Sequence, residues 1–248
     1  MIPNAFHFVF FGNRKYDFGL LEYLAIKSAQ DVNRPERIYF HTNREPDTIW
    51  WDRIKEHVTV VPTDVPTHIF GKELFCWQHR SDITRLQKLY RHGGIYMDFD
   101  TLCLRPFTDL LHHPCVLGRW YGKQEAVFNA VILCEPQSKF IRLWYNTYRM
   151  FSPHEYTEQS SKVPTRLIRD ARVKPHIHTL EPGLIFCAKT EKLRLLFDSP
   201  KTDLLDDAYC IHYNRTLNKD GFLAQVDEEY IRTADTVFAK IARKHLGQ

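Results

Sequence analysis

The stretch that decides the fold runs from residue 81 to 107 and reads SDITRLQKLYRHGGIYMDFDTLCLRPF. In its first half, apolar side chains recur every three or four positions, which predicts a helix from about residue 72 to 92. Gly93 and Gly94 follow and predict the end of that helix, because glycine tolerates a positive φ. The apolar run after them, at residues 95–100, predicts a strand.

Asp98 and Asp100 stand two positions apart at the end of this predicted strand. Residues i and i+2 of a strand point to the same face, so both carboxylates can face one cation. In an open α/β sheet, ligands bind at the carboxyl ends of the strands. Carboxylates there suit Mg²⁺ or Mn²⁺, and the sequence therefore predicts a divalent metal site at the sheet edge.

Asp82 and Arg85 lie three positions apart on the predicted helix and so share one of its faces. Because that helix leads directly into the strand, it returns this pair to the sheet edge near the two aspartates. Two interpretations stay open. The pair is either a surface ion pair of little energetic weight, or a site in which Arg85 binds a diphosphate or sugar and Asp82 binds a hydroxyl.

Outward from this stretch, short apolar runs alternate with amphipathic segments. Strands are predicted at 6–12, 37–42, 58–63, 115–120, 126–136 and 208–213, and helices at 18–25, 47–57, 138–151 and 227–246. The β-α-β-α-β order of the first part favours a largely parallel sheet covered by helices. Residues 158–165, EQSSKVPT, are predicted to form a mobile surface loop.

The composition is that of one globular domain. Of 248 residues, 44% are hydrophobic and 26% charged, and the formal net charge of +4 comes without a Lys/Arg block. This argues against nucleic acid as a partner and leaves room for an anionic small ligand. The six cysteines lack a CxxC motif and lie in apolar segments, which indicates core residues of a reducing compartment.

The N-terminus has no signal-peptide pattern, and no apolar run approaches the ~18 residues of a membrane span. A cytoplasmic location is therefore predicted, with at most peripheral membrane contact. A lumenal protein that has lost its anchor is the alternative.

The pattern S-D-x-x-R, then Y-x-x-G-G-I-Y-x-D-x-D and R-P, resembles the DxD-containing sugar transferases of glycosyltransferase family 32. That family includes initiating α-1,6-mannosyltransferases and relatives of the α-1,4-galactosyl- and N-acetylglucosaminyltransferases, and the pattern is also similar to the core of the large glucosylating toxins. The resemblance implies an α/β GT-A fold with a Rossmann-like, mostly parallel central sheet flanked by helices. It implies one catalytic domain, with a nucleotide-binding half at 1–107, a donor-sugar and acceptor half at 108–226, and a C-terminal helix at 227–248.

Three further segments resemble family motifs. IPNAFHFVFFG is similar to the family's opening strand, with Phe10 where tryptophan is usual, and implies that Phe8, Val9 and Phe10 lie beside the nucleotide base. FNAVIL implies that Asn129 faces the donor sugar. CIHYN implies that His212 supplies a further metal or diphosphate contact; a core histidine is the structural alternative.

The resemblance also implies an activity: retaining transfer of a hexose or N-acetylhexosamine from a nucleotide-diphosphate sugar, UDP favoured over GDP, to a glycan, glycolipid or other hydroxyl acceptor. Mn²⁺ or Mg²⁺ would be the cofactor. Asp100 would hold the metal, with Asp98 direct or through water, and His212 or Asn214 would complete its shell.

Donor binding would fall to the residues around the acids, namely Asp82, Arg85, Tyr96 and Asp98, with Arg85 stabilising the departing charge. Glu181 in TLEPGLIF is a candidate stabiliser of the cationic sugar, or else a surface acid.

Two other functions compete with this interpretation. MDFDT also fits haloacid-dehalogenase-like phosphatases, in which Asp98 would be the nucleophile and Asp100 the acid/base. That fold needs a later acidic motif after a strand, and Asp206 and Asp207 instead precede their apolar run. The second alternative is a non-catalytic protein that binds a nucleotide sugar.

Overall fold

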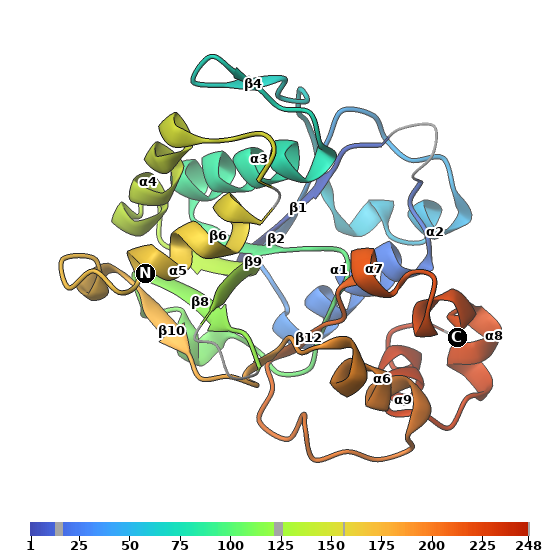
Figure 1. The fold of residues 1–248 in the computed structure, drawn as a ribbon. Helices are drawn as coiled ribbons and strands as arrows, with labels where there is room; N and C mark the ends of the chain where they lie inside the picture. Colours follow the sequence, from blue (N-terminus) through green and yellow to red (C-terminus); the bar gives the residue numbers. More distant parts are fainter. Residues whose placement is uncertain (13–16, 122–125, 156, 248) are drawn as a thin grey trace.

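The computed structural model describes residues 1–12, 17–121, 126–155 and 157–247. A seven-stranded sheet with the order β10-β8-β9-β6-β1-β2-β3 forms its centre (Figure 1). Its strands are β1 (Ala5–Phe10), β2 (Arg37–Thr42), β3 (Thr59–Pro62), β6 (Gly94–Met97), β8 (Cys115–Arg119), β9 (Val127–Cys134) and β10 (His178–Leu180). The pairs β1–β2, β1–β6, β2–β3 and β8–β10 are parallel, and β9 runs antiparallel to both of its neighbours. The predicted, mostly parallel sheet is confirmed.

Helices cover both faces of this sheet. The two faces of β1 are therefore buried in different cores. Phe8 and Phe10 pack in the core shared with α1 (Leu20–Asn33). Val9 packs in the core shared with α3 (Trp77–His92) and α4 (Lys139–Asn146). A strand buried on both faces reads as the continuous apolar run seen in the sequence.

A second sheet of three strands joins the segment after β6 to late segments of the chain. Its order is β11-β12-β7, with β7 (Thr101–Cys103), β11 (Ile185–Phe186) and β12 (Cys210–His212). β7 follows β6 after a short turn, and β12 runs antiparallel to β7 with His212 opposite Thr101. This pairing brings a segment more than 100 positions away to the end of β6.

The remaining elements are short. They are the hairpin of β4 (His68–Ile69) and β5 (Lys72–Glu73), and the helices α2 (Ile49–Asp52), α5 (Val163–Leu167), α6 (Thr190–Asp198), α7 (Arg215–Asn218), α8 (Glu228–Thr233) and α9 (Val237–Arg243). Single 3₁₀ turns lie at Lys55–His57, Thr108–Leu110, Thr147–Met150, Lys174–His176 and Phe222–Gln225, and a π-helix at Glu158–Lys162. The expected helices at 47–57 and 138–151 are thus shorter and continue as 3₁₀ turns, and the expected 72–92 helix begins at Trp77 because residues 72–73 belong to the hairpin.

The prediction of one C-terminal helix at 227–248 is wrong. The chain turns extended at Ala234, and the side chain of Thr236 caps a second helix by accepting a hydrogen bond from the Ala239 amide. α6, α8 and α9 gather in one corner of the molecule (Figure 1). There Phe238 stacks on Phe197 with ring centroids 4.3 Å apart. Burying this ring on α6 favours the break over a continuous helix.

The predicted mobile loop at 158–165 is also wrong, since these residues form the π-helix and the start of α5. Hydrogen bonds tie the segment to the core, and two of them are short. Ser161 Oγ donates to the Val127 carbonyl at 2.8 Å, and Trp144 Nε1 donates to the Gln159 carbonyl at 2.8 Å.

Candidate active site

The two aspartates lie in the turn that joins β6 to β7, not along a strand. β6 ends at Met97, and Phe99 and Asp100 form the turn. The Asp98 amide still donates to the Ala130 carbonyl at 2.8 Å, which extends the β6–β9 pairing by one residue. The expected strand through residue 100 is therefore too long, but the acids do lie at the carboxyl end of β6.

The preceding glycines hold this turn at the sheet edge. Gly93 and Gly94 both have positive φ, 66° and 101°, as predicted for the end of the helix. A Cβ on Gly94 would lie only 2.5 Å from the Ala5 carbonyl oxygen of β1. The chain can therefore leave α3 and enter the sheet beside β1 only because these positions lack side chains.

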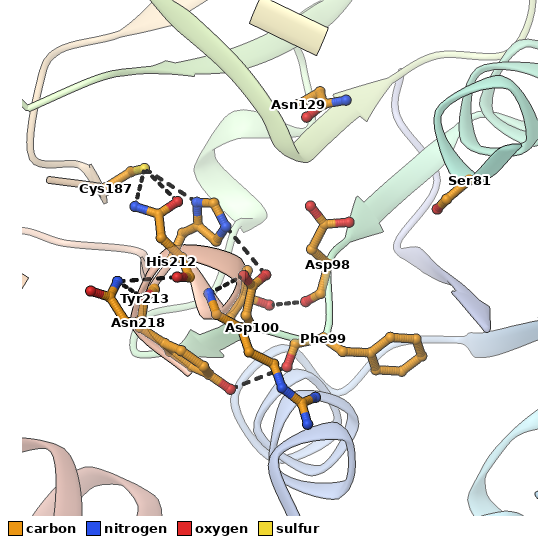
Figure 2. A network of polar contacts seen from close by, with 12 residues as sticks. Ser81, Asp98, Phe99, Asp100, Asn129, Cys187, His212, Tyr213 and Asn218 are labelled. Carbon is orange, nitrogen blue, oxygen red and sulfur yellow. Dashed lines mark hydrogen bonds and ion pairs between the residues drawn. The ribbon is translucent and has the colours of Figure 1, made fainter. Parts of the chain in front are cut away.

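Asp98, Asp100 and His212 converge above this turn (Figure 2). One ligand atom from each lies within 4.8 Å of the others, and His212 Nε2 is 3.2 Å from an Asp100 carboxylate oxygen. One divalent cation fits such a spread, because its bonds to ligands measure about 2.0–2.6 Å. The structure thus brings together three of the four residues predicted to hold a metal.

Backbone groups fix the Asp100 carboxylate. The Arg215 amide donates to Asp100 Oδ2 at 2.8 Å, and the Tyr213 amide donates to the Asp100 carbonyl at 3.0 Å. Burial raises the pKa of Asp100, but His212 and the hydrogen bond from the Arg215 amide outweigh it, so its pKa lies below the usual value. Asp100 is therefore held as a carboxylate, the form that binds a cation.

Cys187 fixes the ring of His212 from the other side. Its Sγ lies 3.2 Å from His212 Nδ1, which leaves Nε2 facing Asp100. Burial lowers the pKa of His212, but Asp100 and Cys187 raise it well above the usual value. Sequence reasoning missed Cys187, since its apolar setting in LIFC gives no sign of a polar neighbour.

Asn214, the alternative metal ligand, points elsewhere. Its backbone is left-handed, with φ 50°, and caps α7. Its side-chain amide lies 3.4 Å from the Ala188 carbonyl and contacts Cys187 Sγ. The amide thus braces Cys187 and does not join the carboxylates.

The interpretation of Asp82 and Arg85 as a surface ion pair is wrong. Their side chains are 6% and 5% exposed, and the Arg85 guanidinium lies 3.2 Å from Asp82 and 3.1 Å from Asp98. Arg85 also donates to the Asn129 carbonyl at 2.7 Å, and Asn129 Nδ2 donates to Asp82 at 2.7 Å. As predicted, the helix returns this pair to the two acids.

This network supports the acids from within the protein. The Tyr96 hydroxyl donates to Asp98 at 2.6 Å, and the Arg85 guanidinium stacks on the Tyr96 ring at 4.2 Å. Burial raises the pKa of Asp98, which Arg85 partly offsets; burial lowers the pKa of Arg85, but Asp98 reverses the sign and raises it. Because the side chains of Asp82, Arg85 and Tyr96 are at most 6% exposed, they position Asp98 from within the protein. The expectation that they bind the donor directly stays a prediction.

The aromatic side chains of β1 lie in the core. Phe8 and Phe10 are fully buried, and Val9 lies in the opposite core. Phe8 stacks on Phe99 of the acid turn at 5.3 Å. Because the strand is buried on both faces, these side chains expose little surface to a nucleotide base, and the expected contact with the base stays a prediction. Their role is to pack the turn.

Glu181 is a surface acid. Its carboxylate lies 3.3 Å from Arg119 Nη1, and among the contacts of the described residues it joins neither the two aspartates nor His212. The role of a sugar-cation stabiliser has no geometric support here. Asp206 and Asp207, which the phosphatase alternative would need, are exposed before β12.

The architecture of the sheet is that of a known fold. The mostly parallel sheet, with acids at its carboxyl edge, is the GT-A fold of glycosyltransferases. Over the whole chain, the structure is similar to the glycosyltransferase GlyE of Streptococcus pneumoniae TIGR4, with a TM-score of 0.58, 13% identity and 61% of that chain covered. It is also similar to mouse xyloside xylosyltransferase 1, with a TM-score of 0.51, 11% identity, and 86% and 98% of the two chains covered.

Sequence comparison finds a match to a protein family in part of the chain. Residues 15–117 match the family described as glycosyltransferase sugar-binding region containing DXD motif. The chain is 28% identical to glucan organizing enzyme 1 of Cryptococcus neoformans var. grubii over all of its length and 71% of that protein. It is 35% identical to inositol phosphoceramide mannosyltransferase 3 of Schizosaccharomyces pombe over 24% of this chain and 17% of that one. The predicted resemblance to DxD-containing glycosyltransferases is confirmed, and it leaves the phosphatase alternative without support.

Proposed function

We propose that this protein is a metal-dependent glycosyltransferase that moves a hexose or N-acetylhexosamine from a nucleotide-diphosphate sugar to a glycan, glycolipid or other hydroxyl acceptor, with retention at the anomeric carbon. The observation that carries the proposal is the convergence of Asp98, Asp100 and His212 at the carboxyl edge of a GT-A sheet. Two carboxylates and one imidazole favour Mn²⁺, which accepts nitrogen more readily than Ca²⁺ or Mg²⁺ does.

The three converging residues would hold the cation, which when bound offsets negative charge on the leaving diphosphate. The protein's own contribution is to fix them beforehand. Arg85 and Tyr96 hold Asp98, the Arg215 amide holds Asp100, and Cys187 sets the ring of His212. Such outer contacts typically account for 10–100-fold in metal affinity or activity.

For the sugar itself, we propose transfer on the face that the phosphate leaves. The bond from the anomeric carbon to the phosphate oxygen breaks, the bond to the acceptor oxygen forms, and the acceptor proton passes to a phosphate oxygen. Asn129 is half-buried beside Asp82 and is the residue that we place nearest the donor sugar. UDP-sugars are the first donors to test, with GDP-mannose as the alternative.

Activity is tested by measuring Mn²⁺-dependent release of nucleoside diphosphate from UDP-glucose, UDP-galactose, UDP-N-acetylglucosamine and GDP-mannose. We expect turnover of one donor that chelator abolishes. Asp100→Asn should lower it by about 10²-fold or more, because a charge that stabilises the leaving group is lost. Weaker Mn²⁺ binding by the same variant, followed by electron paramagnetic resonance, checks the metal site without relying on activity.

Asp206→Asn is the matched control, since it neutralises an exposed acid outside the cluster and should leave turnover unchanged. Full activity of Asp100→Asn, or activity in excess chelator, would count against the proposal. Tight donor binding with no turnover of any donor would instead identify a non-catalytic binding protein.

A further inference from the structure

Four exposed apolar side chains lie in two segments of the chain that contact each other. Phe70, Phe75, Trp77 and Met150 are among eight large hydrophobic residues exposed in the described part of the chain, and Phe75 and Met150 are 59% and 84% exposed. The first three lie between the β4–β5 hairpin and the start of α3, and Met150 follows α4. These four residues are called the hairpin patch below. Clustered exposed apolar groups mark interaction sites more often than scattered ones do.

Contacts hold the two segments of the patch together. The Phe70 ring lies 5.6 Å from the ring of Tyr145 on α4, and the Arg149 guanidinium lies 4.3 Å above Phe70. Lys72 Nζ donates to the Phe151 carbonyl at 2.7 Å. The hairpin therefore rests on the end of α4, and Figure 1 shows it projecting from the body of the molecule.

Cations border the patch. Arg149 stacks on Phe70, and Arg80 stacks on Trp77 at 4.8 Å. Segments 68–80 and 142–152 hold four basic residues and one acidic residue; these are Lys72, Arg80, Arg142 and Arg149, and Glu73. The patch therefore combines apolar rings with guanidinium groups that stay available to anions.

Helix α3 links the patch to the acid turn. α3 ends at the glycines that lead into β6, so its first turn lies at the sheet edge that carries Asp98. Trp77 and Arg85 are eight positions apart on α3, about 12 Å along the helix. Between them Ser81 Oγ accepts from Arg85 at 3.2 Å, and Arg85 contacts Asp98.

We propose that the hairpin patch docks this protein on an anionic lipid bilayer. Phe70, Phe75 and Met150 have no polar side-chain group with which to bind a sugar or a peptide backbone, whereas they suit the boundary between headgroups and acyl chains. The guanidinium groups of Arg80 and Arg149 can bind lipid phosphates. A projecting hairpin inserts into an interface, while a soluble glycan needs a hollowed surface with hydrogen-bonding groups.

Docking in this way places the metal cluster beside the headgroup layer. The described residues contain no helix that could span a bilayer. Under the proposed function, the acceptor hydroxyl would then belong to a molecule held at the membrane surface. The docking itself does not depend on catalysis.

Co-sedimentation with phosphatidylcholine vesicles, with and without phosphatidylserine, tests the proposal. We expect binding only to vesicles that contain phosphatidylserine. Phe70→Ser with Phe75→Ser should weaken it by about tenfold or more, since two inserted rings are lost. Arg149→Glu should weaken it by at least about fivefold, the value of one basic residue near an anionic surface.

The controls change exposed residues elsewhere. Ile49→Ser with Leu217→Ser, and Arg194→Glu, should bind as the unmodified protein does. Asp100→Asn should also bind normally, which separates failure of docking from failure of the transferase proposal. The proposal is overturned if the folded protein ignores phosphatidylserine, if patch and control variants bind alike, or if the patch variants lose a soluble glycan or protein partner instead of vesicles.

Discussion

Replacing Arg85 by leucine tests whether the buried network holds the acid turn. The change removes the guanidinium that lies 3.2 Å from Asp82 and 3.1 Å from Asp98, together with a 2.7 Å hydrogen bond to the Asn129 carbonyl. Leucine fills part of the volume but pairs with none of them. Asp82, 6% exposed, is left without its cation, and Asp98, 26% exposed, is left with the Tyr96 hydroxyl.

Removing one partner of a buried ion pair lowers the free energy of unfolding by about 3–5 kcal/mol, because the remaining charge stays desolvated. A domain is typically stable by about 5–15 kcal/mol, so we expect the variant to fold. For a chain of this size the loss corresponds to a fall in Tm of roughly 6–20 °C. Arg194→Leu is the control, because it breaks a 2.8 Å pair with Asp198 that is largely exposed, and should cost less than about 1 kcal/mol.

Urea unfolding followed by tryptophan fluorescence gives the two free energies of unfolding. Adding Asp82→Asn to Arg85→Leu should restore part of the loss, since it removes the more deeply buried orphaned charge. Adding Asp98→Asn should restore less, because Asp98 is partly solvated. A loss below about 1 kcal/mol for Arg85→Leu, or additive losses in the double variants, would refute the reasoning.

Two further outcomes follow from backbone geometry and from buried histidines. Gly94→Ala should destabilise the fold by more than Gly71→Ala does: both positions have positive φ, which costs roughly 1–3 kcal/mol, but only at Gly94 would the Cβ meet backbone, 2.5 Å from the Ala5 oxygen. Equal losses in thermal unfolding would contradict this. Stability should also fall as pH drops from about 6.5 towards 4, because burial lowers the pKa of His7 to about 4 and of His41 to about 2, so the unfolded chain binds more protons there. His7 alone accounts for about 3 kcal/mol at 1.36 kcal/mol per pKa unit, and His7→Gln should therefore flatten the dependence of urea unfolding on pH; an unchanged slope would count against a neutral, buried His7.

Local patterns in the sequence predicted the parts of the site that are close together along the chain. The helix before the acids, the two glycines and the short strand follow one another within residues 77–97, and patterns over a few neighbouring residues predict them. The same local logic predicted that Asp82 and Arg85 return to Asp98. It overextended the strand by placing the acids on it, because periodicity shows which residues are apolar and not where pairing with β9 stops.

Residues that meet from far apart depended on the tertiary structure. His212 was suggested by a motif, but its position beside Asp100 comes from the register of β12 against β7. Cys187 had no local signal, and its contact with His212 arises from the pairing of β11 with β12. Burial also depended on the tertiary structure. Phe8 and Phe10, which were expected beside the base, are core residues.

The sequence by itself determined the succession of elements and the presence of two acids after an apolar strand, because helix and strand periods and glycine's freedom at positive φ act over a few residues. Only the tertiary structure decided which charges are buried and which distant side chains share a site. Those outcomes depend on how whole faces of helices and sheets pack against one another. The apolar period of one face does not show which other face packs against it.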